Sequence, residues 1–79
     1  MNKEILEPGC LCSVKRLIKL EENFIGIKNG DIVMLLYAEP WKYLNGMIQY
    51  VFLTADGTKI NYDHHILSEV LKRFSRIRK

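Results

Sequence analysis

The stretch Asp31-Ile32-Val33-Met34-Leu35-Leu36-Tyr37-Ala38 decides the fold class of this chain. From residue 32 to residue 38 it is apolar without interruption, and it is the longest apolar run in the sequence. A run of this length is typical of a strand buried on both faces, and it is well short of the roughly 18 residues that suggest a membrane span. We therefore expect a central β-strand at residues 31–38, and no membrane-spanning segment.

Turn signals divide the rest of the chain into short segments. They are Pro8-Gly9, Asn29-Gly30, Asn45-Gly46 and Asp56-Gly57. Segments 10–17, 47–55 and 58–62 are rich in β-branched and aromatic residues, which favour strands. Asp56-Gly57 suits a tight hairpin between the last two. Several short strands with no long helix between them predict a mainly β protein, built as a small antiparallel barrel.

Two segments allow alternative interpretations. Residues 17–28 form either a protruding loop or a pair of short extended arms whose apolar side chains fold back on the barrel; these side chains are Phe24, Ile25 and Ile27. Near the carboxyl end, Asp63 could cap a helix with an apolar stripe formed by Ile66, Leu67, Val70, Leu71 and Phe74. The alternative there is a single turn at residues 64–67, followed by a closing strand through Val70 and Leu71.

The order of these motifs resembles that of SH3-like barrels. Glu7-Pro8-Gly9 opens the first strand, Asn29-Gly30-Asp31-Ile32-Val33 opens the second, and Asp56-Gly57 precedes a short closing segment. The pattern, over roughly residues 7–74, is similar to small barrel proteins of unknown function encoded by tailed bacteriophages. The resemblance implies about five strands, with a single-turn helix before the last strand and residues 68–74 partly in that strand. It also implies an accessory protein that binds a host or phage partner.

Charge is distributed unevenly along the 79 residues, which are enough for a single domain. The net charge of +3 divides into −2 for residues 1–71, with seven basic and nine acidic residues, and +5 for residues 72–79. We expect a barrel over about residues 7–71 and a basic tail at 72–79. Basic clusters of this kind contact nucleic acid or an acidic partner. The expected contact residues are Lys15, Arg16, Lys72, Arg73, Arg76, Arg78 and Lys79.

An aromatic segment lies between the second and third expected strands. Trp41, Lys42 and Tyr43 would be exposed in a loop there, and Trp and Tyr are enriched at the energetic centres of protein interfaces. The alternative is that Trp41 plugs one end of the barrel. We favour binding of a protein partner through the exposed loop and terminal surfaces, with direct DNA or RNA binding by the basic cluster as the alternative.

Catalytic and metal chemistry find little support in the sequence. Cys10, Cys12, His64 and His65 lack the spacing of a zinc site, because residues two apart on a strand share one face whereas adjacent residues face opposite sides. Nor do paired carboxylates suggest acid–base catalysis. We expect no enzyme activity, no metal and no cofactor. The two cysteines are too close to staple a useful loop, and residues 1–4 lead into no signal core, so we expect reduced thiols and a cytoplasmic location.

Overall fold

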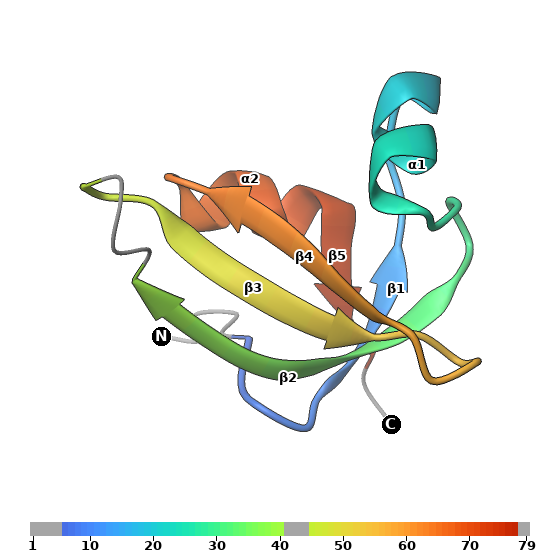
Figure 1. Cartoon of the computed structure of the whole chain (residues 1–79), viewed down its shortest axis with the longest axis horizontal. Helices are drawn as coiled ribbons and strands as arrows, with labels where there is room; N and C mark the ends of the chain where they lie inside the picture. The colour runs from blue at the N-terminus through green and yellow to red at the C-terminus, as the bar shows by residue number, and fades with distance from the viewer. Residues whose placement is uncertain (1–5, 41–44, 78–79) are drawn as a thin grey trace.

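The computed structural model describes residues 6–40 and 45–77. Its elements are β1 (Leu11–Val14), α1 (Lys19–Ile25), β2 (Ile32–Pro40), β3 (Ile48–Leu53), β4 (Lys59–His64), α2 (Leu67–Arg73) and β5 (Phe74–Arg76) (Figure 1). All neighbouring strands are antiparallel, in the order β4-β3-β2-β1-β5. The prediction of a mainly β fold is confirmed, and β2 is the central strand of the sheet, but it is not buried on both faces, because Ile32 and Tyr37 are exposed.

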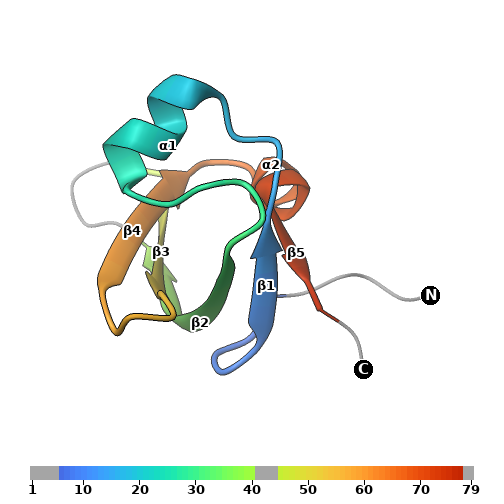
Figure 2. The same ribbon diagram turned by 90° about the vertical axis from the view of Figure 1, so that its right-hand side faces the viewer.

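The sheet is strongly bent and open. Figure 2 shows it curling so that β4 and β5, at its two ends, lie on opposite sides of a concave face. These edge strands are not hydrogen-bonded to each other, and α2 links them while contacting both. The fold is therefore barrel-like, with a helix between the two edge strands in place of strand-to-strand closure.

Aromatic stacking joins the two ends of this sheet inside the core. The rings of Phe52 on β3 and Phe74 on β5 stack with their centroids 4.2 Å apart, and the ring of Tyr62 on β4 lies 5.1 Å from that of Phe74. Phe52 and Phe74 have no exposed surface. Burial of this apolar area is the main stabilising contribution available to so small a domain.

Residues 17–28 contain a helix, which neither sequence interpretation included. Helix α1 begins after Ile18, whose backbone N–H donates to Glu21 Oε1 at 3.1 Å, and it ends at Gly26, which has a φ of 89°. Glycine takes this left-handed conformation without a steric penalty. Ile27 is buried in the core as expected, but Phe24 is not folded back: 90% of its surface is exposed.

The carboxyl end combines the two interpretations offered for it. Helix α2 is present, but Asp63 belongs to β4 and the residue before the helix is Ile66. A closing strand is also present, but it starts at Phe74 and does not pass through Val70 and Leu71. The helix stops there because β1 needs a partner: the N–H of Lys15 donates to the Arg73 carbonyl at 2.9 Å, and the N–H of Ile77 to that of Leu11 at 2.9 Å.

The expected boundary at residue 71 is therefore wrong. Residues 72–76 complete α2 and form β5, so this basic segment is part of the fold up to the end of the closing strand. Phe74, in the middle of it, belongs to the fully buried core. Charge alone separated these residues from the rest of the chain, whereas strand pairing and apolar burial join them to it.

Candidate binding surface

The most exposed apolar side chains among the described residues lie on α1. Phe24 is 90% exposed and Leu20 is 72% exposed. Residues four positions apart lie on the same side of a helix, so the two side chains form one apolar patch. We call this patch the α1 surface. Contiguous apolar patches, unlike single exposed residues, are typical of sites that contact another molecule.

A groove runs between α1 and β4, beside the α1 surface. Its volume is about 380 Å³, and its lining consists of Leu20, Glu21, Phe24, Ile25, Asn61, Tyr62 and Asp63. Figure 2 shows α1 and β4 along the same side of the molecule. The wall from α1 is mostly apolar, while Glu21 and Asp63 bring carboxylates to the groove. Burial raises the pKa of the Tyr62 phenol, which helps to keep this group neutral.

Several polar contacts hold α1 in place. Asn29 accepts a hydrogen bond from the Leu17 N–H at 2.8 Å and donates one to the Leu17 carbonyl at 2.9 Å, which closes the segment that carries the helix. The Asn29 N–H in turn donates to Glu22 Oε2 at 2.8 Å. Glu21 Oε2 lies 3.4 Å from Arg73 Nε, linking α1 to α2. The α1 surface is therefore positioned before any partner binds.

Strand pairing brings part of the predicted basic set together. The backbone bond between Lys15 and Arg73 places the end of β1 beside the end of α2. The side chains of Lys72 and Arg73 are already paired, however: Lys72 Nζ lies 2.9 Å from Glu69 Oε2, and Arg73 Nη1 lies 3.4 Å from Glu69 Oε1. The hydrogen bond from Lys72, together with the charges of Lys72 and Arg73, lowers the pKa of Glu69. These two cations thus already have carboxylate partners within the chain.

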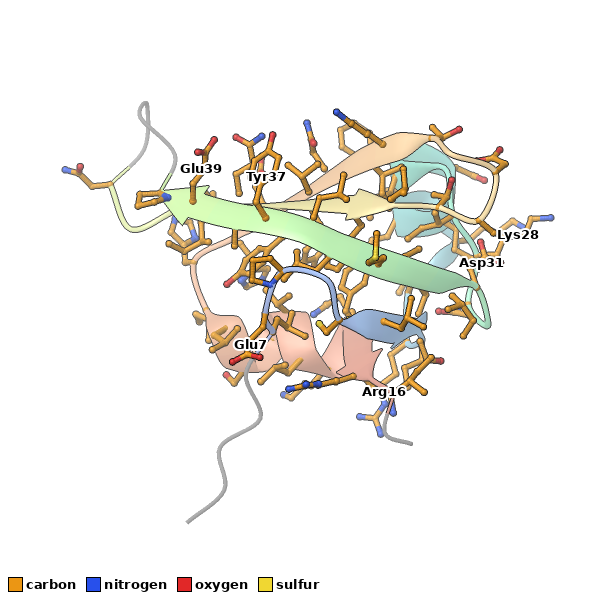
Figure 3. The ribbon with its side chains drawn as sticks, turned by 90° about the horizontal axis from the view of Figure 1, so that it is seen from below. Glu7, Arg16, Lys28, Asp31, Tyr37 and Glu39 are labelled. Atoms are coloured by element: carbon orange, nitrogen blue, oxygen red, sulfur yellow. The ribbon has the colours of Figure 1, made fainter. Side chains whose placement is uncertain are left out.

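The remaining basic residues differ in what the structure says of them. Lys15, Arg16 and Arg76 are exposed, and no ion pair involves them within the described part of the chain. Figure 3 shows Arg16 on the side of the molecule that carries β1, α2 and β5. Arg78 and Lys79 lie outside the described residues, as do Trp41, Lys42 and Tyr43. Exposure of the aromatic loop thus stays a prediction.

The cysteines and histidines have structural roles. Cys12 is buried in the core, and its Sγ lies 3.8 Å from that of Cys10. His64 Nδ1 accepts a hydrogen bond from the Ile66 N–H at 3.0 Å, so this histidine stabilises the turn before α2. Over residues 6–40 and 45–77, no three His, Cys, Asp or Glu side chains cluster as metal ligands would. Within the same ranges, no helix has the length and hydropathy needed to cross a membrane.

Comparison with known proteins adds no family or homologue. No family model matches the chain, and neither a curated protein nor a solved structure was found to be similar to it.

Neither sequence interpretation of residues 17–28 predicts the α1 surface, because neither includes a helix there. Leu20 and Phe24 have the spacing of one helical turn, and Gly26 follows as a stop signal, so a short helix could have been predicted. Its seven residues are too few for periodicity to identify the exposed side. Tertiary contacts, among them the packing of Ile27, the bonds of Asn29 and the Glu21–Arg73 ion pair, determine which way the helix faces.

Proposed function

We propose that the protein is a non-enzymatic binding module that engages a protein partner through the α1 surface. The observation that carries this proposal is the 90% exposure of Phe24 beside an exposed Leu20 and an open groove. The resemblance of its motif order to small phage barrel proteins supports an accessory role with a host or phage partner in the cytoplasm.

The energetics favour this surface as an anchor. Complete burial of one such side chain contributes about 1.5–3 kcal/mol. Because the bonds of Asn29 and the packing of Ile27 already order the α1 segment, a partner loses little free energy in fixing the helix. A large apolar side chain at the centre of a contact is also the usual place for a hot spot.

The test compares Phe24→Ala with Ile66→Ala in affinity capture from host lysate treated with nuclease. Ile66 is also an exposed large apolar residue, at 52%, but it precedes α2 and does not line the α1–β4 groove. We expect Phe24→Ala to weaken capture by about 2 kcal/mol, roughly 30-fold in affinity, and Ile66→Ala to leave it unchanged. Undiminished capture by Phe24→Ala would refute the proposal. Because Phe24 is almost fully exposed, we expect the fold to tolerate the change.

Nucleic-acid binding is the second candidate function. It is supported by the pairing of β1 with β5, which places Arg76 opposite Cys12, three residues along the chain from Lys15. Each phosphate contacted on duplex DNA adds about 0.9 to the slope of log affinity against log salt. Arg16→Gln and Arg76→Gln should each reduce this slope. If the intact protein binds neither DNA nor RNA at low salt, this candidate is eliminated.

A further inference from the structure

We propose that two copies of this chain pair through β4 across a twofold axis, which would join their sheets into one continuous antiparallel sheet. This inference goes beyond the proposed function and does not depend on it. It rests on the hydrogen-bonding capacity of the β4 edge and on the order of charges along it.

The outer edge of β4 carries backbone groups without partners. Because the N–H of Thr54 donates to the Thr58 carbonyl at 2.8 Å, the alternation of an antiparallel ladder directs the N–H and C=O groups of every second β4 residue away from β3. These residues are Lys59, Asn61 and Asp63. Within the described residues, these outward groups accept or donate no hydrogen bond. The other end of the sheet offers less, because β5 has only three residues.

The position of Pro40 independently supports the conclusion that the backbone groups of Lys59, Asn61 and Asp63 point away from β3. The same alternation, carried across β3 to β2, makes Pro40 and Ile48 a pair that exchanges no backbone hydrogen bonds. A proline has no N–H to donate, so such a position is one where it can join a strand. The alternation of hydrogen-bonded and non-hydrogen-bonded pairs that follows from Thr54 and Thr58 is therefore consistent with the presence of a proline at residue 40.

Charge selects one register for the pairing of the two strands. With the twofold axis at Asn61, each Lys59 lies directly opposite Asp63 of the second copy, and Asn61 lies opposite its own equivalent. Centring the pair on Lys59 or on Asp63 would place like charges opposite each other. Opposite charges at facing positions stabilise an antiparallel pair and like charges destabilise it. The β4 edge is thus complementary to itself in the Asn61-centred register.

Three of the features that usually prevent edge pairing are absent from this stretch. Such features include proline, a bulge, and charged side chains that point inward. Residues 59–64 contain no proline, and their pairing with β3 is regular. The charged side chains of Lys59 and Asp63 are exposed, while Ile60 and Tyr62 between them are buried. No proline, bulge or inward-pointing charge along β4 therefore opposes the addition of a strand, which would lie beside the α1–β4 groove.

The test is charge reversal followed by size-exclusion chromatography with light scattering over a concentration series. The 9.3 kDa chain should elute as a dimer of about 18.6 kDa at high concentration. Lys59→Glu alone, or Asp63→Lys alone, makes both facing pairs repulsive and should raise the dimer dissociation constant at least about tenfold. The double variant K59E/D63K should dimerise again, and an equimolar mixture of the two single variants should form a heterodimer.

Matched control variants distinguish an effect of charge at the β4 edge from an effect of the net charge of the protein. Arg16→Glu and Glu7→Lys change the charge by the same amounts, and Figure 3 shows both residues near β1 and α2, away from β4. They should leave dimerisation unchanged. Asn61→Pro removes an N–H that has no partner within one chain and places the proline ring at the edge, so it should give a folded monomer. Should that variant unfold, concentration-dependent protection of the wild-type amides at residues 59, 61 and 63 from hydrogen exchange supplies the same information.

Three results would overturn the proposal. The first is a wild-type protein that stays monomeric up to millimolar concentration, as expected if the edge pairs instead with an extended segment of another protein. The second is a dimer that single charge reversals do not weaken. The third is failure of the double variant to dimerise although it is folded. Phe24→Ala alters no group in this strand pairing, so failure of the dimer and failure of partner binding are distinguishable.

Discussion

Removal of the Phe74 ring is expected to unfold much of the protein, although this residue lies in a segment that charge alone assigns to a tail. Phe74 is fully buried, and it contacts Phe52 and Tyr62 at ring distances of 4.2 and 5.1 Å. Replacing a buried Phe with Ala costs about 3–5 kcal/mol. We expect Phe74→Ala to fall in the upper half of this range, because each aromatic pair adds about 0.5–1.5 kcal/mol.

This loss is comparable to the whole stability of the domain. At roughly 0.05–0.15 kcal/mol per residue, a chain of 79 residues has a free energy of unfolding of about 4–12 kcal/mol. Urea unfolding followed by far-ultraviolet circular dichroism measures the change directly. With a slope of about 1 kcal/mol per molar urea, the midpoint should fall by roughly 4–5 M. A chain ending at Leu71 lacks Phe74 and the whole of β5, so it should not fold.

Arg76→Ala is the control, because it removes a charge from the same strand but its side chain is exposed. It should change the free energy of unfolding by less than about 0.5 kcal/mol. Our reasoning would be refuted if Phe74→Ala lost less than about 1 kcal/mol, the range of a peripheral substitution. Cooperative folding of the chain that ends at Leu71 would refute it equally. Either outcome would mean that the closing strand is dispensable.

Two further predictions concern the helices. Gly26→Ala should lower the free energy of unfolding by about 1 kcal/mol, because residue 26 has a φ of 89° while no atom lies within 4 Å of the added methyl. Gly26→Asn should lower it by less, because asparagine tolerates this conformation better than alanine. Equal stability of the wild type and both variants in urea would contradict this reasoning. Glu69→Gln should lower the melting temperature at neutral pH. The lowered pKa of Glu69 stabilises the fold above its ordinary value of about 4.5, and this contribution is lost as the pH falls through the lower folded value. The difference in melting temperature between wild type and variant should therefore shrink in acid, and a constant difference would argue against the ion pairs.

Much of the fold was predictable because strands in this chain carry local signals. The apolar run ending at Ala38 identified the central strand, and the Asp56-Gly57 pair identified the hairpin between β3 and β4. In each case the information lies in residues that are close in sequence, where turn chemistry and side-chain type act directly.

The candidate binding surface was much less predictable. The direction of α1 depends on the Asn29 amide and on Ile27, both of which act on residues outside the helix. The pairing of Arg73 with Glu21 depends on the meeting of two helices that are distant in the sequence, whereas its pairing with Glu69 lies within α2. Charge along the sequence predicts that Arg73 is among the cations available to a ligand. The structure shows that its guanidinium group already lies between two carboxylates.

By itself, the sequence determined that the protein is mainly β, that the apolar run at residues 32–38 lies in the central strand, and that a tight turn connects β3 and β4. Only the tertiary structure decided where the domain ends and which groups remain exposed. The unpaired backbone of β1 requires β5, and burial of Phe74 ties this strand to the core, so the basic segment folds with the rest of the chain. That contact spans some 60 residues, from β1 to β5, and therefore leaves no local pattern in the sequence.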